Sequence, residues 1–508
     1  MFIPMFLLWL LVIIPLLVVQ AVSGPRGVLI NCGSSTDFTL GSLQYTADIN
    51  FATTGTTVTL PNSTTLHPPL STLRHFPSPT PKPCYVIPTL KSHLYLIRTT
   101  FFYGAFDGGD SPPVFEQWVV GTRWSRVDTR EDYEKGLASY YEVTVRARGR
   151  SVEVCFGGGG FVNVVEVLSL GDGNGLYGGV DLGKVALGGV GRSFFGGVKE
   201  MISFPDDEFN RFWQVYKDTN PTVVCQSNIT SSDFWNLPPP LALNTAITTS
   251  RGKTLEIQWP RGSLPASNYY IVLYFQDNRN PSPYSWRVLN VSINGQLFYS
   301  KLNVTAKGVS VYSTEWPLSG QTKITLTPEE GIPVGPLINA AEIFQILPLG
   351  GWTQTRDVMA MEALAKSLDN RPADWHGDPC LPQQYTWTGV SCSESKMSAR
   401  VTTLNLTGMG LSCSLPSSIG NLTSLHHLWL GDNKLSGHIP DLSSLMLLET
   451  LHMENNQLDG SIPESLGKLR RIKQIYLQNN ELDGKVPESL KNRQDLDIRL
   501  TPGNNLVQ

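Results

Sequence analysis

Residues 428–440 of the 508-residue chain read LWLGDNKLSGHIP. The same order of aliphatic residues, asparagine, glycine and proline returns at 451–463 as LHMENNQLDGSIP and at 475–487 as IYLQNNELDGKVP. A partial copy, LNLTGMGLSCSLP, precedes them at 404–416. The period of 23 to 24 residues predicts a stack of similar units in place of a single globular core.

Each position in the unit has a physical task. Leu428 and Leu430 point into the stack from a short strand, while the Asn433 side chain can satisfy backbone groups where the chain turns. One unit buries about five aliphatic side chains, worth roughly 1.5–3 kcal/mol each, whereas ordering each residue costs roughly 1.5 kcal/mol. A single unit is therefore unstable alone. We predict four such leucine-rich repeats over residues 400–498 and a tail at 499–508.

The open N-terminal end of such a stack needs a cover, and residues 352–399 are predicted to provide it. Residues 355–368 carry apolar side chains at helical spacing. Two tryptophan-containing segments follow, and a disulfide between their cysteines, Cys380 and Cys392, would close the cap.

The chain has seven cysteines, so one thiol is left over if the others pair in an oxidising compartment. Cys413 stands where the later repeats have glycine, and we expect it to be the unpaired, partly buried thiol. The sequence leaves the pairing of Cys32, Cys84, Cys155 and Cys225 open.

Side chains between the inward-pointing aliphatic residues of the repeat strands face the concave side of the stack. Aromatic residues recur there at the repeat period, as they do on recognition surfaces. The same positions face solvent in any solenoid, so a face without a partner is the alternative, and a glycan on Asn405 would crowd one end. The predicted partner-binding stripe comprises Asn405, His427, Trp429, Thr450, His452, Glu454, Gln474, Tyr476 and Gln478.

Residues 1–23 are almost wholly apolar and end in the small-residue spacing Ala21-Val22-Ser23, which predicts a cleavable signal peptide. An uncleaved signal anchor is the alternative, because the segment is long and has no Lys or Arg before its apolar run. No second apolar stretch of spanning length follows. We therefore expect a secretory-pathway protein, extracellular or held at the cell surface by such an anchor or by a partner. Six glycosylation sequons agree, at Asn62, Asn228, Asn290, Asn303, Asn405 and Asn421.

Residues 24–350 change to short β-rich runs separated by Gly, Pro and Asn/Asp turns, a pattern typical of β-sandwiches. The length exceeds one sandwich, so we predict two, at 24–200 and 201–350. Residues 61–83 are predicted to be a surface loop, and the glycine-rich residues 171–197 flexible turns or an inserted loop.

Several stretches in this region resemble the plant malectin-like domain: Ile30–Gly33, Arg98–Gly108, Ile202–Glu208, Tyr270–Phe275, Asn290–Gly295 and Pro336–Phe344. Followed by the cap and the repeats, they resemble the ectodomain of the plant malectin-like leucine-rich-repeat receptor family. The resemblance implies a mainly β fold with a repeat solenoid. Tandem malectin-like β-sandwiches of carbohydrate-binding type would precede an α/β (β/3-10) leucine-rich-repeat solenoid.

The resemblance also implies a function. The family's receptor kinases continue into a membrane span and a kinase, whereas this sequence ends after the repeats. We expect a receptor-like protein without a signalling domain. It would recognise cell-wall carbohydrate, a peptide or a protein at the plant cell surface and act with a membrane receptor-kinase co-receptor. The alternative is a secreted wall lectin or an inhibitor of a wall-degrading enzyme.

Sugar binding calls for an aromatic face that stacks on the ring, beside carboxylate or amide groups that accept from hydroxyls. One predicted site takes Tyr103, Phe106 and Asp107 with Trp118 nearby, and a weaker analogue takes Phe275, Asp277 and Asn278. The alternative is that these residues serve packing and turns.

Other chemistry is not expected. The 39 Lys and Arg balance 43 Asp and Glu without long runs, which disfavours nucleic acid as a partner. A phosphate-loop-like spacing at 178–184 is followed by Val185 where Ser or Thr should hold magnesium, so no nucleotide is expected. Metal-ligand spacing and a Gly-x-Ser-x-Gly motif are missing, so we expect no metal, no cofactor and no enzyme. A glycoside-active enzyme is the minor alternative, since two carboxylates can meet in space.

Overall fold

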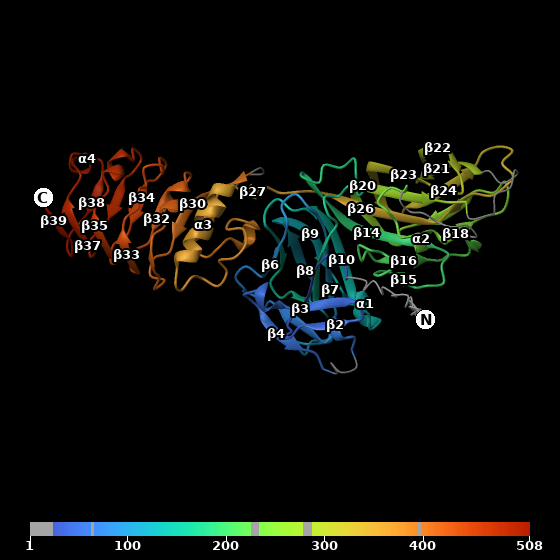
Figure 1. Ribbon diagram of the computed structural model, residues 1–508, viewed down its shortest axis with the longest axis horizontal. Coiled ribbons are helices and arrows are strands. Elements are labelled where there is room, and N and C mark those ends of the chain that lie inside the picture. Colours follow the sequence, from blue (N-terminus) through green and yellow to red (C-terminus); the bar gives the residue numbers. More distant parts are fainter. Residues whose placement is uncertain (1–23, 62–65, 225–232, 278–286, 394–397, 508) are drawn as a thin grey trace, which may run out of the picture.

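The computed structural model describes residues 24–61, 66–224, 233–277, 287–393 and 398–507. The predicted signal peptide, Asn62, Asn228, Cys225 and Asn278 lie outside these ranges. The molecule is elongated, with a strand-rich part at one end and the repeats at the other (Figure 1). Helices are few and short, which agrees with the predicted mainly β class.

One long sheet runs through the whole strand-rich part. The strand β14 is hydrogen-bonded to β26 from Val185↔Pro348 to Phe194↔Ala340. β14 comes from the first predicted half and β26 from the second, so the predicted boundary at residue 200 falls within a continuous sheet. The main path of the sheet is β2 (Phe38–Leu40), β3 (Leu43–Ala47), β1 (Gly27–Asn31), β13 (Val164–Ser169), β7 (Leu94–Phe101), β10 (Ser139–Arg146), β14 (Val185–Phe195), β26 (Ala340–Pro348), β20 (Leu264–Phe275) and β23 (Val309–Gly320).

Two smaller sheets pack against this long sheet, each across its own core. Ile97 of β7 and Val154 of β11 share one core, and Leu273 of β20 and Val291 of β21 share the other. Each half is thus two-layered. The first small sheet is β6 (Cys84–Pro88), β11 (Ser151–Phe156), β8 (Phe115–Val119) and β9 (Thr122–Val127); the second is β19 (Leu255–Gln258), β24 (Lys323–Pro328), β21 (Arg287–Ile293) and β22 (Gln296–Val304).

Two segments predicted as loops contain strands. The predicted loop 61–83 includes β5 (Thr72–His75), which pairs with β4 (Thr56–Thr59). The glycine-rich segment 171–197 includes β14. Gly188 lies in this strand where β26 approaches closely, since an added Cβ would meet the Leu347 side chain at 3.0 Å.

Buried charges cross the middle of the long sheet. Arg98 Nη1 donates to Glu166 at 2.6 Å, and Arg98 Nη2 donates to Glu142 at 2.6 Å. Arg192 Nη1 donates to Glu142 at 2.6 Å, and its Nε donates to Glu342 at 2.8 Å. Because Arg192 lies on β14 and Glu342 opposite it on β26, this pair joins the two halves. All five side chains are buried, so each charge depends on its partners.

The repeats form two parallel ladders. One consists of β30 (Val401–Asn405), β32 (His427–Trp429), β34 (Thr450–His452), β36 (Gln474–Tyr476) and β38 (Asp497–Arg499), preceded by the antiparallel β28 (Val390–Cys392). The other consists of β31 (Ser412–Ser414), β33 (Lys434–His438), β35 (Gln457–Ser461), β37 (Glu481–Lys485) and β39 (Asn505–Val507).

Asparagine side chains connect successive repeats. Asn456 Oδ1 accepts from the Leu435 N–H at 3.0 Å, and its Nδ2 donates to the Leu430 carbonyl at 3.0 Å. Asn504 makes the same bond to Leu482 at 3.0 Å. Because Asn504, β38 and β39 extend the pattern, the predicted tail 499–508 continues the repeats instead of leaving the stack.

The cap contains the helix α3 (Thr355–Ser367), close to the predicted bounds. Met361 and Leu364 are buried against the repeats, whereas Met359 is 62% exposed. Asp357 of α3 is buried and accepts from Arg400 Nε at 2.9 Å. This ion pair fixes the helix to the first repeat strand.

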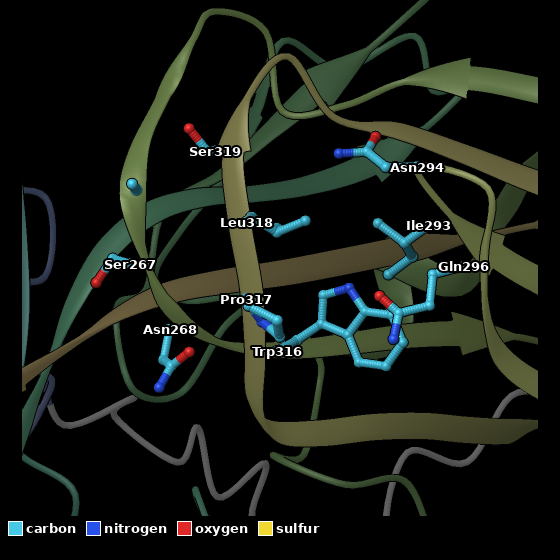
Figure 2. A pocket seen from close by; sticks show the side chains of 10 residues that line it. Ser267, Asn268, Ile293, Asn294, Gln296, Trp316, Pro317, Leu318 and Ser319 are labelled. Carbon is cyan, nitrogen blue, oxygen red and sulfur yellow. The ribbon is translucent and has the colours of Figure 1, made fainter.

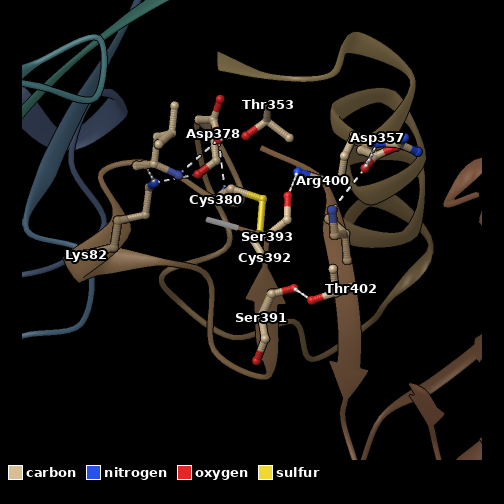
Figure 3. Close-up of a disulfide and its surroundings, with 12 residues drawn as sticks. Lys82, Thr353, Asp357, Asp378, Cys380, Ser391, Cys392, Ser393, Arg400 and Thr402 are labelled. Atoms are coloured by element: carbon tan, nitrogen blue, oxygen red, sulfur yellow. Dashed lines mark hydrogen bonds and ion pairs between the residues drawn. A yellow bond between two sulfur atoms is a disulfide. The ribbon is translucent and has the colours of Figure 1, made fainter. Parts of the chain in front are cut away.

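The strand-rich part contacts the cap beside the Cys380–Cys392 disulfide (Figure 3). Lys82 Nζ donates to the carbonyls of Asp378 at 2.6 Å and Leu381 at 2.7 Å, and pairs with Glu153 at 3.3 Å. The Asp378 N–H donates to the same Glu153 carboxylate. Burial raises the pKa of Glu153 to about 7, and the positive charge of Lys82 counters part of this effect.

The first prediction concerns the charges in the long sheet. Arg192→Leu should lower the free energy of unfolding by about 3–5 kcal/mol, because two buried carboxylates each lose a partner. Arg123→Leu is the matched control, since the Arg123–Glu116 pair is bidentate and Arg123 is 64% exposed. The control should cost at most about 1 kcal/mol. Urea unfolding measures the free energy of unfolding of both variants. Equal losses for the two would contradict the role assigned to Arg192.

The second prediction concerns pH. Between the ordinary pKa of 4.5 and about 7, the folded chain keeps the Glu153 proton that the unfolded chain has lost. Stability from this group therefore falls as pH rises through that window, by on the order of 3 kcal/mol in total. His376 acts oppositely, because burial lowers its pKa to about 4 and stability is lost as pH falls from 6.5.

In Glu153→Gln, the pH dependence of stability at this junction comes from His376 alone. The free energy of unfolding of this variant should therefore rise more steeply with pH between pH 4.5 and 7 than that of the unmodified chain. Urea unfolding at several pH values measures the difference. Glu116→Gln, at the surface pair, is the control and should keep the original slope. Parallel curves for Glu153→Gln and the unmodified chain would refute the explanation.

Candidate functional site

The residues predicted to bind sugar in the first half lie in a packed loop. Tyr103 is 2% exposed, and its hydroxyl donates to Asp107. Burial raises the pKa of Tyr103, and the hydrogen bond to Asp107 raises it further. The Phe106 ring lies 5.5 Å from Tyr103 and 5.3 Å from Phe161. The structure brings these three residues together, but the Tyr103 ring has no open face for a sugar.

The other predicted sugar contacts are placed elsewhere. Trp118 packs with the Cys84–Cys155 disulfide, and its ring meets Tyr385 of the cap at 5.5 Å. It is therefore part of the junction and not of a site with Tyr103. Phe275 is fully buried, so the prediction that it stacks on a sugar is wrong. Asp277 is buried too and pairs with Arg287 at 3.2 Å.

The stripe predicted on the repeats has a regular geometry. We call it the ladder face: the outward side chains of β30, β32, β34, β36 and β38 and of the residues that follow them. The rings of Trp429 and His452 are stacked with centroids 5.9 Å apart, and those of His452 and Tyr476 with centroids 4.3 Å apart. The Arg499 guanidinium lies 4.3 Å from the Tyr476 ring centroid. A continuous stack therefore crosses four strands.

Hydrogen bonds orient these rings. Thr450 Oγ1 accepts from Trp429 Nε1 at 2.7 Å and lies 2.9 Å from His427 Nδ1. The Tyr476 hydroxyl donates to Asp497 at 2.6 Å, and this bond raises the pKa of Tyr476. Trp429 and Tyr476 are thus each held by a polar group on the next strand, and the His452 ring is stacked between them.

Three polar atoms beside the stack lack a hydrogen-bond partner among the described residues: His452 Nε2, Glu454 Oε2 and Gln478 Oε1. Each is shielded from solvent in the free chain. Unpaired buried polar atoms cost about 1–3 kcal/mol each.

A hollow of about 520 Å³ lies at the N-terminal end of the ladder face. Residues 386–391 of the cap form one wall, and Asn405, Met409 and Trp429 form the other. Asn405 is exposed, so a glycan on its sequon would lie at the mouth of this hollow.

The cysteines that the structure describes form two disulfides, Cys84–Cys155 and the predicted Cys380–Cys392. Cys413 is unpaired and buried as predicted, and Cys32 is a second buried free thiol. Burial raises the pKa of both free thiols. In the described part of the chain one group has metal-ligand geometry, namely Cys84, Glu153 and Cys155. Its two sulfurs are bonded to each other, so it offers no thiolate pair.

The sequence profile of the Malectin-like domain matches residues 30–346, which is more than half of the chain. The chain belongs to the malectin-like domain family. Its C-terminal part matches the Leucine rich repeat N-terminal domain at 355–393 and the Leucine Rich Repeat at 424–445 and 447–469. The order predicted from the sequence is therefore confirmed.

Curated relatives of this malectin-like chain are receptor-like kinases of Arabidopsis thaliana. The probable LRR receptor-like serine/threonine-protein kinase At1g67720 is 29% identical over 87% of this chain and 49% of its own length. The probable kinase At5g59680 is 28% identical over 71% of this chain and 41% of its own length. The chain thus spans about half the length of the curated relatives it matches.

Solved structures share the fold of the malectin-like part. The ANX2 ectodomain from Arabidopsis thaliana has a TM-score of 0.51 and 16% identity, and the match covers 63% of this chain and 97% of that one. A structure of plant peptide RALF23 in complex with FER and LLG2 has a TM-score of 0.52 and 18% identity, with 64% and 96% covered. These similarities support a receptor-type ectodomain fold.

Within the described ranges, no helix combines the length and the apolar character needed to cross a membrane.

The sequons yield the third prediction. Three of the described sequon residues are exposed, namely Asn303, Asn405 and Asn421. In contrast, the nitrogen of Asn290 to which a glycan would be attached, Nδ2, donates a hydrogen bond to Glu329. Glycan occupancy should therefore be high at the three exposed sites and low at Asn290 in chain secreted from plant cells. Mass spectrometry of glycopeptides measures it. Full occupancy at Asn290 would contradict the geometry.

Proposed function

We propose that the chain is an extracellular recognition ectodomain whose ladder face binds a peptide or protein partner. The observation that supports this most is the pre-ordered stack of Trp429, His452 and Tyr476. Aromatic side chains offer large contact areas at low conformational entropy cost, and they are enriched among residues that dominate binding energies.

The dimensions of the ladder face favour an extended segment. Five strands with neighbours about 4.8 Å apart span about 19 Å, which an extended peptide crosses with about six residues at about 3.3 Å each. The unpaired atoms of His452, Glu454 and Gln478 would bond to its polar groups.

Similarity to the curated relatives supports a location of this chain at the plant cell surface. They are receptor-like kinases, and a peptide, RALF23, is bound in the complex of FER with LLG2. We infer that the present chain takes part in recognition together with a membrane receptor-kinase co-receptor. Binding and not catalysis is the proposed role of both parts.

The fourth prediction tests the ladder face. The full chain is screened against a displayed library of random 12-residue peptides, and the bound peptides are measured with variants. Trp429→Ala and Tyr476→Ala should each weaken binding by about tenfold or more, since each removes a large aromatic ring of the stack. Tyr299→Ala is the control, an exposed aromatic residue of the malectin-like part at 47% exposure, and should not change affinity.

Two outcomes would refute the proposal: no peptide binds, or the selected peptides bind all three variants equally well. Thermal unfolding of each variant verifies that the repeats remain folded.

A further inference from the structure

Two acidic side chains border the aromatic stack of the ladder face. Asp432 lies three residues after Trp429 of β32, and Glu454 lies two residues after His452 of β34. The Asp432 N–H donates to the Glu454 carbonyl at 3.0 Å, so the two acidic residues lie on neighbouring repeats. Burial alternates from Leu451 to Glu454, which shows that Glu454 faces outward on the same side as His452. The Glu454 carboxylate is therefore part of the ladder face.

A glycine gives this carboxylate its place. In the outward row of the ladder face, Gly431 stands where the two following repeats have Glu454 and Gln478. A Cβ added at Gly431 would meet Glu454 Oε1 at 2.8 Å, so the carboxylate lies over the glycine. The Glu454 side chain thus reaches back from its own repeat toward the repeat that carries Trp429.

The Glu454 carboxylate has no cation beside it. Among the residues that the structure describes, Glu454 forms no ion pair, and its Oε2 has no hydrogen-bond partner. The neighbouring cations already have acidic partners, at 2.7 Å in Lys473–Glu449 and at 3.6 Å in Arg499–Asp497. A partly shielded negative charge without a partner is stabilised when a cation from another molecule pairs with it.

We propose that the ladder face selects peptides with a lysine or arginine side chain, which pairs with Glu454. This inference rests on the peptide-binding function proposed above and specifies the chemistry of the peptide. The cationic group would bond to the Glu454 carboxylate, since hydrogen bonds between charged groups are stronger than neutral ones. Its aliphatic stem would lie along the stack, where the Trp429 ring also attracts a cation. Asp432 adds negative charge on the adjacent repeat.

An aromatic surface without a carboxylate offers a comparison within the same chain. Figure 2 shows the Trp316 indole beside Gln296 in a hollow of about 550 Å³ in the malectin-like part. The residues that line this hollow include no acidic or basic side chain. It provides aromatic contact but no partner for a cation, so peptides chosen for a basic residue should bind at the ladder face instead.

The test begins with the peptides that the full chain selects from the random 12-residue library. Lysine or arginine should be enriched among the peptides that bind Trp429→Ala more weakly. Glu454→Gln should weaken the binding of these peptides by roughly tenfold, because it removes the charge and keeps the shape of the side chain. Glu449→Gln is the matched control, since Glu449 is already paired with Lys473, and it should leave the affinity unchanged.

A double-mutant cycle then assigns the contact. The basic residue of a selected peptide is replaced by glutamine, and both peptides are titrated calorimetrically against the unmodified chain and Glu454→Gln. The replacement should cost roughly tenfold in affinity with the unmodified chain and less than about twofold with Glu454→Gln, because the charge partner is already gone. Gly431→Ala should also weaken the basic peptide, since the added methyl group displaces the carboxylate without removing its charge.

Two results would overturn this inference and leave the proposed function intact. The first is a set of peptides that depend on Trp429 but show no enrichment of basic residues. The second is a basic residue whose replacement costs the same affinity with the unmodified chain and with Glu454→Gln. An absence of any peptide that depends on Trp429 or Tyr476 would instead refute the proposed function, and this inference with it.

Discussion

The pair of Arg192 and Glu342 spans the seam between the two halves of the malectin-like part, in the middle of a single sheet. Both side chains are buried, so the strands β14 and β26 must stay paired for either charge to be compensated. Glu342 also accepts from the Tyr274 hydroxyl at 2.6 Å, which extends the constraint to β20. This couples the two cores of the malectin-like part.

This body contacts the cap through Lys82 and Glu153. Beyond the cap, asparagine side chains bond each repeat to the next and keep the aromatic rings of the ladder face in register. The proposed binding surface is thus built on the repeats, where stacked rings lie beside unpaired polar atoms.

Local periodicity made the repeats predictable from the sequence, because each aliphatic position is buried in the same way in every unit. The cap helix and the Cys380–Cys392 disulfide could be predicted for the same reason, since both lie within short segments. β14 could not be predicted, because glycine-rich sequence has little strand preference and the strand partner β26 lies about 150 residues away in the chain. Likewise Tyr103 and Phe275 have residue types that suit sugar binding, but burial depends on long-range packing that no local pattern reveals.

Recognition through the ladder face is the central claim, and hydrogen–deuterium exchange tests it directly. The full chain is compared with and without a peptide selected by binding. With the peptide bound, exchange should be slower in β32, β34 and β36 and in the residues that follow each strand, with no change in β20 or β23. Protection confined to the malectin-like part, with unchanged exchange across the repeats, would contradict it.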